Sequence, residues 1–213
     1  MLKYVVFDFD GTLVNSLHVI VDSYNAFAEK YQAKRVDYQD IEYLKSLSMQ
    51  ERSKFVNFKL YKFPLLAVDV YRLYKQRVQE IHPVADMKEL LQGLHAQGIK
   101  LAIISTNAKE IIEQFLRYHQ IDVFDEVICS NHLFGKDKEI RRFLKEKNLQ
   151  ASDIVYVGDE IRDIVAGKKN AVPVIWVSWG YDLLKNVERY APDYRADTPQ
   201  DIARIIQAIQ SKH

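Results

Sequence analysis

Residues Tyr4–Ser16 read YVVFDFDGTLVNS, and this stretch decides how the chain begins to fold. An apolar run leads directly into two carboxylates, Asp8 and Asp10, which are followed by Gly11 and Thr12. In an extended backbone, residues two apart point to the same side, so both carboxylates are expected to face one way. Two such acids at the end of a buried strand are electrostatically costly unless they share a cation or a proton. A strand that runs into a polar turn explains one Asp and the Gly, whereas the second acid indicates a site.

Composition sets a few limits on the class of protein. The chain has 213 residues, which fits one large domain or one domain that carries a smaller insert. Hydrophobic residues make up 48% and charged residues 28%, as is ordinary for a globular protein, and the net charge is +1. This balance implies no field that would attract nucleic acid or another polyanion.

Cysteine content and hydropathy favour a cytoplasmic protein. Cys129 is the only cysteine, lies in the apolar stretch VICS, and is expected to be a buried strand residue. One cysteine excludes an intramolecular disulfide framework and fits a reducing compartment. No apolar run approaches about 18 residues, and the N-terminus has no secretion-signal pattern, so we expect no membrane partner.

From residue 84 onward, short β-branched runs alternate with segments of helical periodicity. This alternation is typical of an α/β fold with a parallel sheet. The apolar runs predict strands at residues 101–105, 127–129, 154–157 and 174–177. Helical stripes separate them, at Met87, Leu90, Leu91 and Leu94; Ile111, Ile112, Phe115 and Leu116; Ile140, Phe143 and Leu144; and Ile202, Ile205, Ile206 and Ile209.

Residues 16–82 have a different pattern and predict an all-helical cap domain inserted into the core. Apolar and aromatic residues recur at helical spacing from Ile20 to Tyr31, and no convincing strand interrupts the segment. Residues 1–15 together with 83–213 then form the core domain. The hinges are expected at the two chain crossings, Asn15–Ser16 and His82–Pro83.

Three further polar clusters fall at predicted strand ends, where open parallel sheets place their sites. Ser105-Thr106-Asn107 follows the 101–105 strand and offers a hydroxyl and backbone N–H groups to an anion, although Ser and Asn also commonly cap helices. Residues 135–138 (GKDK) offer a lysine before a helix. Residues 158–163 (GDEIRD) place Asp159 and Asp163 directly after the 154–157 strand, although a helix N-terminus also tolerates acids.

Taken together, the four clusters resemble the motifs of the haloacid dehalogenase-like (HAD) superfamily, in particular its phosphoglycolate-phosphatase-like members. DFDGTLVNS is similar to the first motif, Ser105 to the second, GKDK to the lysine motif, and GDEIRD to the acidic motif. The resemblance covers essentially the whole chain in the right order. It implies a Rossmann-like parallel-sheet core (the HAD fold) with an inserted helical cap, and a phosphatase activity.

The resemblance also implies roles for individual residues. Asp8 is the expected nucleophile, which forms an aspartyl-phosphate. Asp10 is the expected general acid and then general base, and Thr12 is expected to orient it. The expected substrate-binding residues are Thr12, Ser105, Thr106 and Asn107. The expected ligands of the cofactor Mg²⁺ are Asp8, the backbone carbonyl of Asp10, Asp159 and Asp163.

The motif lysine has two candidates. Family members commonly show Lys-Pro, whereas here Lys136 is followed by Asp137, with Lys138 beyond. Lys136 suits the loop position better, and Lys138 is expected to begin the helix. We therefore favour Lys136.

Other functions compete with a phosphatase. Dehalogenases of the superfamily lack the second aspartate, so Asp10 argues against that branch. A phosphomutase or another phosphotransferase uses the same four motifs, and a non-catalytic binding protein should have lost a catalytic group. The expected substrate is a small phosphorylated metabolite, such as phosphoglycolate or a sugar phosphate, and the oligomeric state is open. Lys45, Arg52 and Lys54 are candidates to meet an anionic substrate, although such charges are usually solvated.

Overall fold

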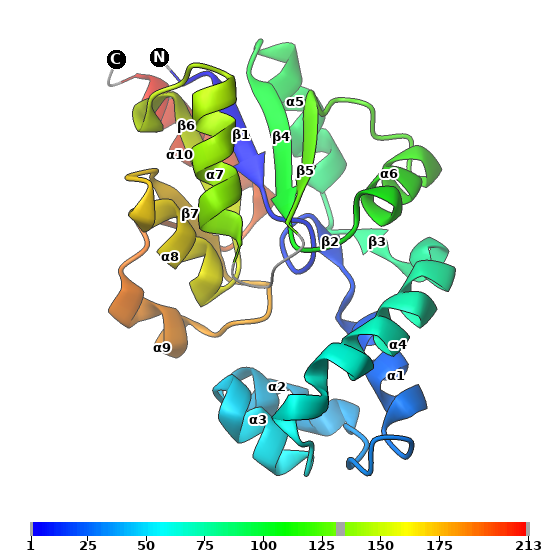
Figure 1. Ribbon diagram of the computed structural model, residues 1–213. Helices are drawn as coiled ribbons and strands as arrows, with labels where there is room; N and C mark the ends of the chain where they lie inside the picture. The colour runs from blue at the N-terminus through cyan, green and yellow to red at the C-terminus, as the bar shows by residue number, and fades with distance from the viewer. Residues whose placement is uncertain (1, 131–134, 212–213) are drawn as a thin grey trace. The chain divides into compact units, whose positions relative to one another are not determined.

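The computed structural model describes residues 2–130 and 135–211. These residues form two compact units, one made of residues 1–15 and 83–213 and the other of residues 16–82 (Figure 1). The first is called the core unit here and the second the inserted unit. Among the described residues, every helix is too short or too polar to cross a lipid bilayer.

The core unit is built on a parallel sheet with β1 in its interior, as the α/β pattern predicts. Within the described residues the strand order is β5-β4-β1-β6-β7-β8, and each neighbouring pair is parallel. The strands are β1 (Tyr4–Phe7), β4 (Lys100–Ser105), β5 (Glu126–Cys129), β6 (Ile154–Gly158), β7 (Val174–Val177) and β8 (Tyr194–Ala196). Because the three central strands end at Phe7, Ser105 and Gly158, the polar clusters that follow them share one edge of the sheet.

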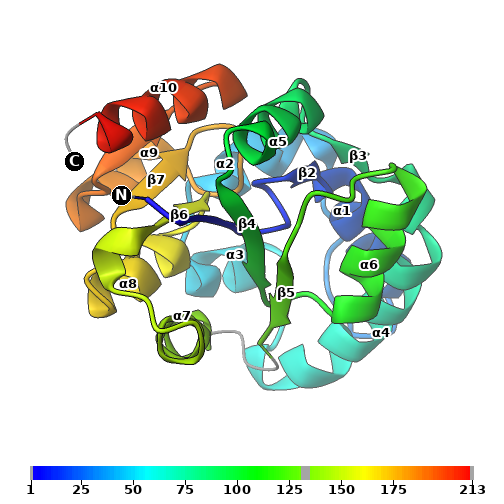
Figure 2. The same cartoon turned by 90° about the horizontal axis from the view of Figure 1, so that it is seen from above.

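Helices cover both faces of this sheet (Figure 2). Helices α7 and α8 contact each other on one face, and α5 and α10 do so on the other. The core helices are α5 (Met87–Ala96), α6 (Lys109–Tyr118), α7 (Lys136–Glu146), α8 (Ile161–Lys169), α9 (Leu184–Val187) and α10 (Pro199–Gln210). Single 3₁₀ turns lie at Ala151–Asp153 and Glu188–Tyr190.

Alternation along the strands explains how the sheet is held. Tyr4 and Val6 of β1 lie in one cluster with Ile140 and Phe143 of α7 and Ile164 of α8, all of them buried. Phe7, which follows Val6 and points to the opposite face of the sheet, is fully buried and packs edge-on against Phe124. Burial of apolar surface on both faces explains why the core strands read as continuous hydrophobic runs. Cys129 lies in β5 as predicted, but it is only half-buried.

Between residues 17 and 80, the regular elements of the inserted unit are all helices or 3₁₀ turns. A small aromatic core formed by Tyr31, Val56, Phe58 and Leu66 holds its helices together. The guanidinium of Arg52 donates to the carbonyl oxygens of Leu44 and Lys45, so this arginine caps the preceding helix. The helices are α1 (Leu17–Phe27), α2 (Ile41–Lys45), α3 (Met49–Phe55) and α4 (Phe63–Gln76), with 3₁₀ turns at Tyr38–Asp40, Leu60–Lys62 and Val78–Glu80.

The chain leaves and re-enters the core at neighbouring points. The short strands β2 (Val14–Asn15) and β3 (His82–Pro83) pair with each other. Beside them, the N–H of Val84 donates to the carbonyl of Leu13 at 3.0 Å. The two segments that join the units therefore lie side by side and are hydrogen-bonded to each other.

Candidate active site

A buried ion triad lies at the end of the central strand. The ammonium nitrogen of Lys136 is 2.6 Å from Asp8 Oδ2 and 2.5 Å from Asp163 Oδ1. All three side chains are almost fully buried, with exposed fractions of 4% for Asp8, 2% for Lys136 and 0% for Asp163. Asp8 directly follows β1, Lys136 begins α7, and Asp163 lies in the first turn of α8. Three elements far apart in sequence therefore supply the triad.

Burial and charge shift the ionisation of this triad. Burial raises the pKa of Asp8 to about 7 even though Lys136 acts in the opposite direction. Burial also acts against the charge on Lys136, but the carboxylates of Asp163 and Asp8 prevail and raise the pKa of the ammonium. The pKa of Asp8 is therefore raised chiefly because burial disfavours the charged form, and the charges of Asp163 and Glu160 add to the effect.

A third acid lies beside Asp8 and Asp163. Carboxylate oxygens of Asp8, Glu160 and Asp163 all lie within 4.8 Å of one another. The backbone N–H of Glu160 donates to Asp163 Oδ2 at 3.0 Å, which fixes the two residues at the start of α8. A compact set of carboxylate oxygens fits a hard divalent cation. The sequence interpretation missed Glu160 because a helix-start acid at that position has an ordinary capping explanation.

Asp10 and Asn107 meet across the sheet edge. The side-chain amide of Asn107 donates to Asp10 Oδ2 at 2.8 Å. The backbone N–H of Asn107 donates to Ser105 Oγ at 3.2 Å, so this N–H group is occupied rather than open to an anion as expected. The Ser105 hydroxyl is buried at the end of β4, and Thr106 is half-buried beside it. The second motif therefore orients the second acid.

Thr12 contacts a different acid from the one expected. Its hydroxyl donates to Asp159 Oδ1 at 2.9 Å, so it orients Asp159 and not Asp10. The other oxygen, Asp159 Oδ2, accepts from the backbone N–H of Tyr181 at 2.7 Å. Burial raises the pKa of Asp159 well above its usual value, with nearby acids adding to the effect. Two hydrogen bonds thus hold the carboxylate of Asp159 beside the group formed by Asp8, Glu160 and Asp163.

Two glycines leave the space that Asp159 fills. A Cβ atom at Gly11 would lie 2.4 Å from Asp159 Oδ2, and one at Gly180 would lie 2.0 Å from Asp159 Cβ. Gly11 also has a φ of +77°, which non-glycine residues rarely adopt. The turn after β1 and the loop after β7 therefore both close onto this carboxylate.

Comparison with known proteins identifies the family. The model of the haloacid dehalogenase-like hydrolase family matches residues 5–177, which is most of the chain. The chain belongs to the haloacid dehalogenase-like hydrolases. The predicted family and the predicted fold are therefore both confirmed, and the protein is a hydrolase.

Similarity to individual relatives extends over the whole hydrolase. The phosphoglycolate phosphatase of Synechococcus elongatus is 25% identical over 206 residues, which cover 96% of this chain and 97% of the relative. Pyrophosphatase PpaX of Bacillus mycoides is 25% identical over 214 residues, with 98% of each chain covered. The crystal structure of a predicted phosphatase from Clostridium acetobutylicum shares the fold, with a TM-score of 0.82, 22% identity, and coverage of 98% and 99%.

Of the two candidate lysines, Lys136 contacts the acids of the hydrolase. It forms both ion pairs of the triad and is the first residue of α7, so the helix begins two residues earlier than expected. Lys138 lies within the first turn of the same helix and is exposed, and it forms neither of those ion pairs. A side chain at the first helical position can still reach back over the strand end.

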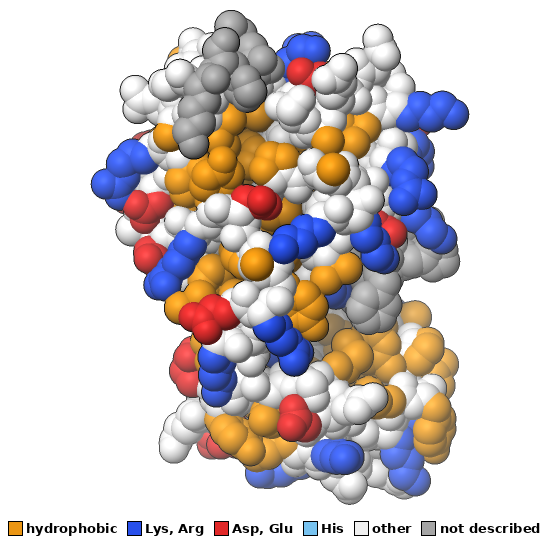
Figure 3. All heavy atoms as spheres, turned by 90° about the vertical axis from the view of Figure 1, so that its left-hand side faces the viewer, with side chains coloured by type: hydrophobic (Ala, Val, Ile, Leu, Met, Phe, Trp, Pro, Cys, Tyr) orange, Lys and Arg blue, Asp and Glu red, His pale blue; other side chains and the backbone are white. Residues whose placement is uncertain are grey.

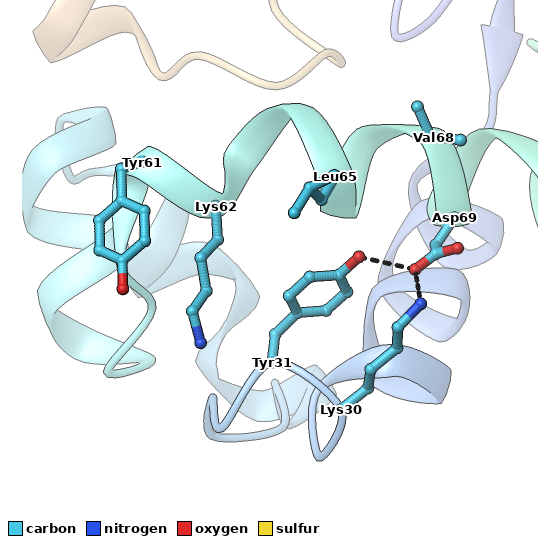
Figure 4. Close-up of a pocket in the computed structure, with 7 residues that line it drawn as sticks. All are labelled: Lys30, Tyr31, Tyr61, Lys62, Leu65, Val68 and Asp69. Atoms are coloured by element: carbon cyan, nitrogen blue, oxygen red, sulfur yellow. Dashed lines mark hydrogen bonds and ion pairs between the residues drawn. The ribbon is translucent and has the colours of Figure 1, made fainter.

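The inserted unit of the hydrolase has a hollow of its own, of about 500 Å³ (Figure 4). Lys30 and Tyr31 converge there on Asp69 Oδ2, at 2.5 Å and 2.7 Å. The two donors satisfy this buried carboxylate, so the network stabilises the packing of α4 on the segment after α1. The hollow is lined by Lys30, Tyr31, Tyr61, Lys62, Leu65, Val68 and Asp69.

Surface charge agrees with the small net charge of the hydrolase. On the face drawn in Figure 3, basic and acidic side chains are interspersed. The formal net charge is +1. On this face the described charges of both signs therefore alternate rather than form a field of one sign.

Proposed function

We propose that this hydrolase is a Mg²⁺-dependent phosphatase that cleaves a small phosphomonoester through an aspartyl-phosphate on Asp8. The observation that carries the proposal is the buried pair of Asp8 and Lys136 at the end of the central strand, with a second acid, Asp10, held nearby by Asn107. The names of the relatives, phosphoglycolate phosphatase and pyrophosphatase, both specify small phosphorylated anions. They support the substrate class.

Asp8 is the proposed nucleophile. Its carboxylate attacks phosphorus, and the bond between phosphorus and the leaving oxygen breaks. Lys136, at 2.6 Å, favours the ionised form of Asp8 and offsets charge on the transferring group. The Ser105 hydroxyl at the end of β4 donates to a phosphoryl oxygen, together with the N–H of Thr106.

Asp10 is the proposed acid and base. It gives its proton to the leaving alkoxide and then removes a proton from the water that hydrolyses the acyl-phosphate. The amide of Asn107 donates to Asp10 Oδ2 at 2.8 Å, which restrains the carboxylate that handles the proton. A carboxylate held in one rotamer loses less entropy when it reaches the reactive geometry.

The metal would be held by Asp8, Glu160 and Asp163, whose oxygens already lie together. Two further groups were expected from the sequence, the carbonyl of Asp10 and the carboxylate of Asp159. Asp159 joins them if it exchanges a hydrogen bond to Thr12 or Tyr181 for the cation. When bound, Mg²⁺ supplies positive charge that neutralises the phosphoryl oxygens.

Hydrolysis of p-nitrophenyl phosphate, phosphoglycolate and pyrophosphate by the purified protein tests the proposal. We expect turnover with Mg²⁺ and less than about 1% of it with EDTA, because EDTA removes the positive charge of the cation. We expect no turnover with the Asp8→Asn variant, because it lacks the nucleophile. Metal-independent turnover, or turnover by Asp8→Asn at the wild-type rate, would overturn the proposal. Failure of every phosphate ester to react would favour a phosphotransferase or a binding protein.

A further inference from the structure

Arg162 is a second cation beside the nucleophile that the proposed reaction has not used. Its Nη2 donates to Glu160 Oε2 in a close ion pair at the start of α8. The guanidinium also interacts electrostatically with Asp163 and Asp8. Arg162 therefore belongs to the same charge network as Lys136.

The Glu160–Arg162 pair lies on the more exposed side of that network. The exposed fractions are 15% for the Glu160 side chain and 22% for Arg162, against 4% or less for Asp8 and Asp163. An anion that enters from solvent meets a field to which Glu160 contributes directly. On its own, Glu160 would repel a phosphate dianion from the nucleophile, because like charges a few ångströms apart strongly disfavour each other.

The balance of charge shows what Arg162 changes. Three carboxylates, Asp8, Glu160 and Asp163, lie together and are opposed by two cations, Lys136 and Arg162. Removing Arg162 adds one net negative charge at the site, and removing the charge of Glu160 takes one away. If both charges are removed together, the net charge is unchanged.

We propose that Arg162 is a positioning residue that neutralises Glu160, so that the site accepts a phosphoryl anion while Glu160 keeps its place among the metal-binding oxygens. The inference rests on the proposed phosphatase function and deepens it. It assigns substrate attraction partly to a residue that acts through Glu160 rather than through contact with phosphate. The ion pairs of Lys136 are with Asp8 and Asp163, whereas Arg162 is the cation that is paired with Glu160.

A double-mutant cycle in the full-length protein tests this assignment. The dissociation constant of inorganic phosphate is measured by calorimetry at Mg²⁺ that saturates every variant, for the wild type, Arg162→Met, Glu160→Gln and the double variant. We expect Arg162→Met to weaken phosphate binding about tenfold, because one added negative charge acts at close range. The double variant should return to within about threefold of the wild type, and Arg162→Lys should recover part of the loss.

The affinity for Mg²⁺ provides a second measurement. A purely structural role of Arg162 would not change the two affinities in opposite ways. Arg162→Met should leave the affinity for Mg²⁺ unchanged or tighter, whereas Glu160→Gln should weaken it about tenfold. Arg204 offers a matched control, since it pairs with Asp201 on α10 and is 74% exposed. Arg204→Met should change neither affinity.

Two results would overturn the inference. One is unchanged phosphate binding by Arg162→Met, and the other is a double variant as weak as Arg162→Met, which would mean that Arg162 contacts phosphate itself. Failure of the wild type to bind phosphate or to hydrolyse any phosphate ester would instead overturn the proposed function. Near-ultraviolet circular dichroism of each variant shows whether it is folded, and the double variant tests the inference even if Arg162→Met alone does not fold.

Discussion

At the scale of single residues, the ammonium of Lys136 is enclosed between two carboxylates with 2% of its side chain exposed. Taking such a charge out of water is costly, and only close partners compensate for that cost. Removing one partner of a buried network therefore disturbs more than the pair that is lost. The carboxylates that remain repel each other at short range.

Replacing each candidate lysine with alanine separates their roles. Lys136→Ala should lower kcat by about 10²–10³-fold and stability by about 3–5 kcal/mol, because Asp8 and Asp163 lose their shared cation. Lys138→Ala should stay within about 0.5 kcal/mol of the wild type. Turnover of a phosphate ester at saturating Mg²⁺ and urea unfolding measure both effects. The opposite ranking would move the motif to Lys138.

The sequence predicted that Asp8, Asp163 and a lysine lie together, but it missed Glu160 and did not predict how the side chains pair. Strand-end position was enough to bring Asp8, Ser105 and Lys136 to one edge of the sheet. Pairing depends on side-chain direction, which spacing does not determine. Thr12 therefore contacts Asp159 instead of Asp10, and Asn107 contacts Asp10 through its side chain.

At the scale of elements, the loop after β7 closes onto the turn after β6. Gly180 allows this approach because a Cβ atom there would overlap Asp159. The indole N–H of Trp176, on β7, donates to the carbonyl of Asp159 at 2.8 Å. Backbone and side chain of this aspartate are therefore both fixed by the neighbouring segment.

Gly180→Ala tests how tightly these elements close. We expect a loss of about 1–3 kcal/mol in the free energy of unfolding, because the new methyl group overlaps Asp159 and the loop must shift. Gly93→Ala is the matched control, since a Cβ there meets nothing within 4 Å in the middle of α5. It should raise stability by about 0.5–1 kcal/mol. Equal urea midpoints for the two variants would contradict the close approach.

Sequence periodicity predicted the order and type of most elements of the core unit, but it did not predict the residues at which they begin and end. Apolar runs identified β4, β6 and β7, because buried parallel strands contain few polar residues. The start of α7 was placed two residues late, since Asp137 is a stronger N-cap residue type than Gly135, which caps the helix without a side chain. Helix starts without a capping side chain leave little trace in sequence.

At the scale of the whole molecule, the site affects stability as well as activity. The pKa of Asp8 is raised from 3.8 to about 7 by burial, against the opposing charge of Lys136. The folded protein therefore binds this proton more tightly than the unfolded chain does. Its contribution to stability is present below about pH 4 and is lost as the pH rises to about 7.

Thermal unfolding in EDTA as a function of pH measures this contribution. The melting temperature of Asp8→Asn relative to the wild type should increase between pH 4 and pH 7, because Asn has no proton to lose. Mg²⁺ should reduce the difference by stabilising the wild type, since a ligand that binds only the folded state raises its stability. A difference that does not vary with pH would contradict the raised pKa of Asp8.

The pairing of the two connecting segments at β2 and β3 has a consequence for how such genes diversify. Because Leu13 and Val84 are already joined, the segment between them starts and finishes at one place, and lengthening it adds little closure entropy. All the acids of the site are encoded outside that segment. Recombination can therefore exchange the whole stretch as a cassette, and the descendants keep every acid of the site.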